Sequence, residues 1–131
     1  MTAADQIEDP SICIVRLGRG ERISVELAKR LNPVDPTSFH VYRLPADTRV
    51  ELHYHDFDEY WCFISGRPRV TLRSPRGPIK EALLEPGDMV ACPRGIEHTL
   101  RADHELVYYQ WDSLRSGGER TGHLVRRTDG G

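Results

Sequence analysis

Short β-type runs of apolar residues, separated by glycine and proline, dominate the chain from residue 39 to residue 111. Many short runs with such turn residues are typical of an all-β sandwich or barrel. The predicted strands are Phe39–Leu44, Arg49–His55, Tyr60–Ser65, Arg69–Leu72, Lys80–Leu84, Met89–Cys92, Thr99–Arg101 and Leu106–Trp111. The pattern therefore predicts an all-β fold over most of the chain.

The chain before residue 39 has a different pattern. The apolar run Ile12–Leu17 predicts a first strand, which ends at a Gly-Arg-Gly sequence. Residues 24–31 begin with a candidate N-cap serine, contain good helix formers and stop at Asn32-Pro33, so they predict one short helix. The predicted organisation is a flexible N-terminal arm (1–11), a single barrel domain (12–114) and a polar tail (115–131), either disordered or ordered only by packing on the barrel or a partner subunit.

The composition of the chain limits the kinds of partner that we expect the protein to have. The chain has 131 residues, with 18 basic and 20 acidic side chains and a net charge of −2, so it lacks the basic footprint of a nucleic-acid-binding protein. It contains no apolar run long enough to span a bilayer, and its polar start lacks the apolar core of a signal peptide. We therefore predict a soluble cytoplasmic protein without nucleic-acid or membrane partners. Its three cysteines have no close spacing, which predicts reduced, mostly buried thiols.

The strongest chemical signal is the stretch His53-Tyr54-His55-Asp56-Phe57-Asp58-Glu59. On a strand, the period of two places the imidazoles of His53 and His55 on the same face. The polar, turn-like residues 56–58 then bring Glu59 onto a neighbouring strand that points at the same place. Two imidazoles and a carboxylate that converge in this way form half of a divalent metal site.

The stretch from Gly87 to His98 supplies a further ligand. A predicted strand runs into a Pro-Arg-Gly turn, and a third histidine follows directly. This turn re-aims the chain, so that His98 faces back into the barrel. The predicted metal ligands are therefore His53, His55, Glu59 and His98. On a six-coordinate metal these four ligands leave two positions for water, substrate or dioxygen.

Residues 53–66 read His-x-His-x3-Glu-x6-Gly, and residues 87–98 read Gly-x5-Pro-x-Gly-x2-His. In this order and at this spacing, they resemble the two conserved motifs of the cupin superfamily. The resemblance covers residues 39–111 and implies a double-stranded β-helix, or jelly-roll barrel, with the four metal ligands named above. Two positions depart from the family pattern. Asp47 stands where glycine is usual, and Ala102 stands where asparagine is usual, which puts the local turns and any role of residue 102 beside the metal in question.

Alternation along the strands predicts which side chains line the interior. The candidate pocket residues are Arg49, Glu51, Trp61, Tyr108 and Gln110, with Tyr42 and Phe63 beside them. Arg49 shares the parity of His53 and is interpreted either as an anchor for a substrate carboxylate or phosphate or as a surface arginine. The aromatic run Tyr108–Trp111 forms either core or a dimer interface. The other histidines, His40, His104 and His123, are predicted surface residues, and His40 is the one placed to contact a metal ligand.

The resemblance implies a metal-dependent cupin enzyme that acts on a small molecule, of dioxygenase, isomerase, cyclase or lyase type. The alternative is a non-catalytic cupin that binds a metal or a small ligand, or a sensor. The ligand set suits Fe, Mn, Ni, Co, Cu and Zn alike. Residues 59–66 and 122–124 are loosely similar to small cupins of bacterial natural-product biosynthesis, some of which act in cyclisation or in nitrogen–nitrogen bond formation. Cupins commonly pair, so we also predict a homodimer.

Overall fold

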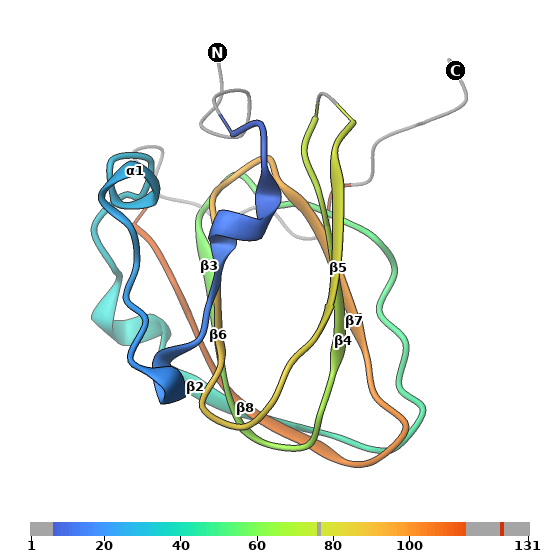
Figure 1. Ribbon diagram of the computed structural model, residues 1–131. Helices are drawn as coiled ribbons and strands as arrows, with labels where there is room; N and C mark the ends of the chain where they lie inside the picture. Colours follow the sequence, from blue (N-terminus) through green and yellow to red (C-terminus); the bar gives the residue numbers. More distant parts are fainter. Residues whose placement is uncertain (1–6, 76, 115–123, 125–131) are drawn as a thin grey trace.

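Two antiparallel sheets face each other across the interior of the protein (Figure 1). The computed structural model describes residues 7–75, 77–114 and 124. The larger sheet has the strand order β1-β6-β3-β8-β2, and the smaller sheet has the order β5-β4-β7. The strands are β1 (Ile14–Val15), β2 (His40–Leu44), β3 (Glu59–Ser65), β4 (Arg69–Arg73), β5 (Ile79–Leu83), β6 (Met89–Cys92), β7 (Glu97–Arg101) and β8 (Leu106–Asp112). The predicted all-β fold is confirmed.

Seven of the eight runs predicted after residue 38 are strands whose ends lie within two residues of the prediction. The run Arg49–His55 differs, because it pairs only through isolated bridges. Arg49 lies opposite Arg101 and His53 lies opposite His98. Arg49 and His53 are four residues apart, whereas their partners Arg101 and His98 are three residues apart. The run therefore contains one extra residue relative to β7. Such a bulge interrupts the alternation of side chains and reverses the face on which the earlier residues lie.

The N-terminal elements are shorter than the apolar pattern predicts. Only Ile14 and Val15 of the predicted first strand pair with β6, and 3-10 turns flank them at Pro10–Cys13 and Leu17–Arg19. The predicted short helix is present as α1 (Val25–Ala28). Its cap is the predicted serine, because the Ser24 hydroxyl accepts a hydrogen bond of 3.1 Å from the backbone N–H of Leu27.

The two terminal segments are described only in part. Within the segment predicted as an N-terminal arm, Ile7 is fully buried, and the Ser74 hydroxyl donates a hydrogen bond of 3.0 Å to its carbonyl. Of the predicted polar tail, Leu124 alone belongs to the described residues. It exchanges two backbone hydrogen bonds with Tyr54, of 2.8 and 3.0 Å. The predicted surface residue His123 and the rest of the tail lie outside the described residues.

The hydrophobic core lies between the sheets. Phe63 of β3 and Val70 and Leu72 of β4 are almost completely shielded from water, and burying a side chain of this size stabilises a fold by about 1.5–3 kcal/mol. The three cysteines are free thiols: Cys13 and Cys92 are buried, and Cys62 is half-buried. Burial raises the pKa of Cys13 to about 12. In the described part of the chain, no helix is long and apolar enough to cross a membrane.

The Asp47 turn explains one departure from the cupin pattern. Asp47 adopts a φ of +64°, a left-handed conformation that glycine adopts without steric cost and that aspartate tolerates better than most residues. Its backbone N–H donates a hydrogen bond of 2.9 Å to the carbonyl of Ala102. The turn at this position therefore keeps a glycine-like backbone although the glycine is replaced. The second unusual position, Ala102, takes part in this turn through its backbone.

Candidate metal centre

Four side chains from both sheets converge on one point in the interior. Glu59 begins β3 of the larger sheet, and His98 lies on β7 of the smaller sheet. His53 and His55 lie on the segment that connects β2 to β3. All four are at least 95% buried, and one ligand atom from each lies within 4.8 Å of the others. The structure thus brings together the four residues that the sequence motifs predicted. The centre bridges the two sheets.

Backbone carbonyls orient the imidazole rings. The Nδ1 of His53 lies 2.6 Å from the carbonyl oxygen of Glu51, and the Nδ1 of His98 lies 3.2 Å from the carbonyl oxygen of Ile96. A ring N–H on Nδ1 would donate to the carbonyl in each pair and would leave Nε2 as the atom able to bind a metal. This arrangement is the usual one for a metal-binding histidine, since it sets both the tautomer and the ring direction.

Glu59 is the charged member of the group. Its Oε2 lies 2.8 Å from His98 Nε2, and its Oε1 lies 3.5 Å from His55 Nε2. Burial raises the pKa of Glu59, but the nearby His98, His55 and His53 lower it by more, so the net pKa lies below its ordinary value. Glu59 is therefore an ionised carboxylate at neutral pH. A buried negative charge among three imidazoles is a favourable environment for a cation.

The chemistry of these donors fits a divalent transition metal. Imidazole nitrogens combined with one carboxylate oxygen are common ligands of Fe, Mn, Co, Ni, Cu and Zn, and they do not distinguish well among these ions. The centre is therefore a candidate metal site of the predicted type.

Two buried carboxylates next to the ligands hold the chain in position. Asp58 is fully buried and accepts hydrogen bonds from the backbone N–H of Asn32 (2.7 Å), the backbone N–H of Arg94 (2.9 Å) and the Arg94 guanidinium (3.0 Å). Glu97, which precedes His98, accepts a bidentate pair from Arg73 at 3.0 and 2.8 Å. From the sequence, Asp58 is expected only to be part of a turn. The sequence gives little indication of its hydrogen bonds, because its partner Arg94 lies far away in the chain.

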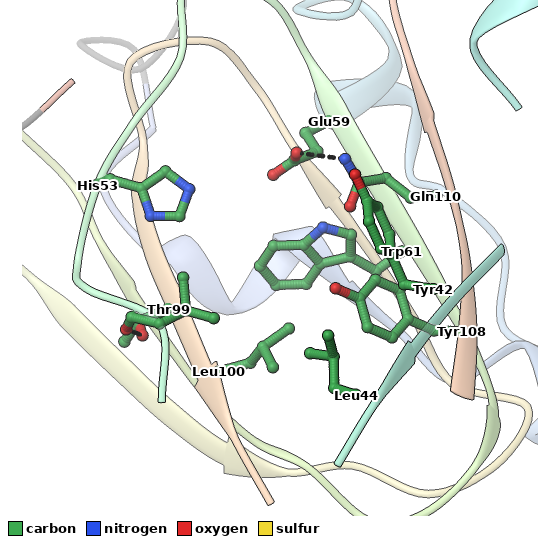
Figure 2. Close-up of a pocket in the computed structure, with 10 residues that line it drawn as sticks. Tyr42, Leu44, His53, Glu59, Trp61, Thr99, Leu100, Tyr108 and Gln110 are labelled. Atoms are coloured by element: carbon green, nitrogen blue, oxygen red, sulfur yellow. Dashed lines mark hydrogen bonds between the residues drawn. The ribbon is translucent and has the colours of Figure 1, made fainter. Parts of the chain in front are cut away.

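A cavity of about 190 Å³ opens beside the centre (Figure 2). It is lined by Tyr42, Leu44, Val50, His53, Glu59, Trp61, Thr99, Leu100, Tyr108 and Gln110. Figure 2 shows His53 on one side of this cavity, with Gln110 and Tyr108 on the other. The predicted pocket residues Trp61, Tyr108 and Gln110 thus line it. Alternation on the predicted strands gave no reason to expect Val50 or Thr99 there.

Arg49 and Glu51 are exposed and are absent from the lining of this cavity. The expectation that both residues share the face of His53 is wrong. The extra residue between Arg49 and His53 reverses the face on which Arg49 lies. Phe63 packs behind the cavity wall, with its ring 5.6 Å from that of Tyr108. His104 is exposed, as predicted, and so is His40, whose ring contacts Tyr42 at 4.5 Å.

Gln110 holds the Glu59 carboxylate in place, since its Nε2 donates a hydrogen bond of 2.7 Å to Glu59 Oε1. Replacing Gln110 by leucine is expected to lower metal affinity by about tenfold, because partners of this kind orient a ligand. The measurement is competition for metal against a chromophoric chelator. The melting temperature without metal should stay close to that of the wild type, which separates positioning from folding. Unchanged metal affinity would contradict this role.

Comparison with known proteins places this geometry in a family. Residues 40–109, more than half of the chain, match the family model of the cupin domain. The uncharacterized protein y4oW of Sinorhizobium fredii is 33% identical over 99 residues, which cover 73% of this chain and 40% of that protein. The chain thus spans less than half the length of this curated relative.

Three similar solved structures share the fold at low sequence identity. The 7S globulin of Momordica charantia has a TM-score of 0.58 and 18% identity, over 70% of this chain and 28% of its own. The cupin domain of Drosophila melanogaster CENP-C has a TM-score of 0.53 and 15% identity, over 58% and 56%. Salicylate 1,2-dioxygenase from Pseudoaminobacter salicylatoxidans has a TM-score of 0.50 and 18% identity, over 58% and 22%. With two antiparallel sheets, a buried three-histidine, one-glutamate centre and the matching family model, this chain belongs to the cupin family.

Proposed function

We propose that this chain is a metal-dependent cupin enzyme that acts on a small molecule. One divalent transition metal is held by the Nε2 atoms of His53, His55 and His98 and by the carboxylate of Glu59. The observation that carries this proposal is the buried convergence of these four side chains beside a cavity. A metal bound here would polarise an oxygen or nitrogen pair of the substrate or activate dioxygen.

The size and lining of the cavity indicate the class of substrate. An apolar cavity of about 150 Å³ is large enough to hold benzene, so a cavity of about 190 Å³ suits a molecule of about one ring. Trp61, Tyr42 and Tyr108 present aromatic surface to it. Burial, with a smaller effect of the Glu59 charge, raises the pKa of Tyr108. Its hydroxyl therefore keeps its proton at neutral pH and is able to donate a hydrogen bond to a substrate oxygen.

Among the reaction types that the resemblance implies, ring oxygenation is the first to test. Salicylate 1,2-dioxygenase shares the fold, and a structure of that enzyme holds gentisate, a single-ring molecule. Isomerase, cyclase and lyase reactions, including nitrogen–nitrogen bond formation in natural-product pathways, are the further candidates. The cytoplasmic location and the absence of nucleic-acid and membrane partners stay predictions of the sequence.

The test is elemental analysis of protein purified without a histidine tag, before and after reconstitution with Fe(II), Mn(II), Ni(II) or Zn(II). About one metal per chain is expected, followed by oxygen consumption with single-ring hydroxy acids such as salicylate and gentisate. Folded protein that takes up none of these metals would refute the proposal. Metal uptake and ligand binding without turnover, over a panel that includes isomerase and cyclase substrates, would instead indicate the non-catalytic binder.

We also propose that two copies pair through the outer face of β2 and β8. β2 is an edge strand, and Val41 lies opposite Tyr109 in register, with exposed fractions of 53% and 49%. Phe39 is 54% exposed and stacks on Trp111 with the ring centroids 5.2 Å apart. Exposed apolar groups clustered beside an open sheet edge are typical of an interface.

The change from Val41 to lysine is expected to convert a dimer into a monomer, because it places a charge at the centre of this face. Light scattering measures the mass of each variant. The control is the change from Val25 to lysine, at a 72% exposed position on α1, which should leave the dimer intact. A monomeric mass for the wild type would contradict the proposal.

A further inference from the structure

Three arginines stand in one row across neighbouring strands on the smaller sheet. Arg69 of β4 lies directly opposite Arg101 of β7, and Arg101 lies directly opposite Arg49 on the next segment. Residues that oppose each other in antiparallel strands have their side chains on the same face, with Cβ atoms about 4.5–5.5 Å apart. The extra residue before His53 is the reason that Arg49 joins this row rather than the metal cavity.

The row has an uncompensated positive charge. All three arginines are exposed, and none of them has an ion-pair partner among the described residues. By contrast, Arg73 and Arg94 each form an ion pair with a carboxylate. Like charges directly opposite each other on a sheet destabilise it. In a chain with a net charge of −2, this concentration of positive charge is therefore not explained by folding.

The row also borders a hollow of about 320 Å³. It is lined by Arg49, Val50, Arg69, Thr71, Glu81, Thr99, Leu100 and Arg101. The carboxylate of Glu81 lies on this hollow, where it accepts a hydrogen bond of 3.4 Å from the Thr71 hydroxyl. A second hollow adds Arg67 to Arg69 and Arg101, with Asp103 beside them. Counting all of these groups, four guanidinium groups and two carboxylates surround the site, so its local charge is positive.

We propose that this arginine row binds a small molecule through a phosphate group. Guanidinium groups form paired hydrogen bonds with the oxygens of phosphate, and a phosphate carries enough charge and oxygen atoms for several arginines at once. Bound there, the anion removes the repulsion among the three side chains. The hollow has room for a phosphate with part of the molecule that bears it. This site is separate from the metal centre and does not depend on a metal being present.

The test is calorimetric titration of the full chain with pyrophosphate at constant ionic strength. The change from Arg101 to glutamine should weaken binding by at least about tenfold, since it removes one positive charge and the paired hydrogen bonds of its guanidinium. The matched control is the change from Arg22 to glutamine, which removes an exposed arginine elsewhere and should leave binding unchanged. Pyrophosphate should also raise the melting temperature of the wild type and of the Arg22 variant, but not that of the Arg101 variant.

Further comparisons separate the proposal from its competitors. Equal binding of pyrophosphate by the wild type and the Arg101 variant, or no binding by either, would overturn it. If citrate binds more tightly than pyrophosphate and its binding also depends on Arg101, the ligand of the site is a carboxylate and not a phosphate. If duplex DNA binds more tightly than pyrophosphate and its binding depends on Arg101, the ligand of the site is a polyanion and not a small molecule. Without any anion, the Arg101 variant should melt no lower than the wild type, because the substitution relieves repulsion.

Discussion

Replacing His98 by alanine is expected to reduce the affinity for a divalent transition metal by more than about a hundredfold. Losing a residue that merely supports a ligand costs about 10–100-fold, and His98 is a proposed ligand itself. Its side chain is almost completely buried, and its Nε2 lies 2.8 Å from Glu59. Among the three proposed histidine ligands, it alone lies within a regular strand, opposite Leu72. No other described histidine is placed to replace it.

The measurement is metal titration by competition with a chromophoric chelator, with Co(II) absorption as a report on the ligand geometry. The matched control is the change from His104 to alanine, which removes an exposed histidine outside the centre and should leave affinity unchanged. Circular dichroism and a melting curve without metal establish that the His98 variant is folded. Should it not fold, the change from His98 to glutamine keeps a similar volume and serves the same comparison. Wild-type affinity in a folded variant would refute the ligand assignment.

Replacing Asp58 by alanine is expected to lower the free energy of unfolding by about 3 kcal/mol. Removing one partner of a buried ion pair typically costs about 3–5 kcal/mol, because the other partner is left without compensation. Asp58 is fully buried, but the side chain of Arg94 is 31% exposed and regains some hydration. This places the effect at the lower end of that range. Two backbone N–H groups, of Asn32 and Arg94, also lose their acceptor.

Urea unfolding of the metal-free protein measures this loss. The control is the change from Asp103 to alanine, at an exposed position, which should alter the unfolding free energy by less than about 0.5 kcal/mol. The change from Asp58 to asparagine keeps one side-chain acceptor and should fall between the two. A loss of less than about 1 kcal/mol in the alanine variant would show that the contacts of Asp58 are replaced by water at little cost.

The convergence of the proposed metal ligands was predictable because local rules place their side chains. The period of two aligns His53 with His55, and the Pro-Arg-Gly turn before His98 marks the change of direction that returns it to the interior. These rules depend on neighbours in sequence, and the structure obeys them at these positions. The strands after residue 38 were predictable for the same reason, since each is bounded by its own turn residues.

The errors arise where distant parts of the chain decide the outcome. The inward placement of Arg49 and Glu51 assumed regular pairing, and the extra residue is visible only once β7 is known to be the partner. The support that Asp58 receives from Arg94 depends on two segments that meet only in the folded chain. The cavity volume depends in turn on the packing of Leu44, Val50 and Leu100 from separate elements. None of these features has a local sequence pattern.

The single extra residue between Arg49 and His53 also affects which charges the two sides of this segment can bind. In regular pairing, the Arg49 guanidinium would share the interior with the proposed cation, and two positive charges a few ångströms apart repel strongly where water is excluded. The offset moves this charge to the opposite side of a wall formed by Val50, Thr99 and Leu100, which border both hollows. On that outer side, water and dissolved ions surround the exposed Arg49 guanidinium and screen its charge from the centre. One short segment can therefore serve a cation on its inner side and an anion on its outer side.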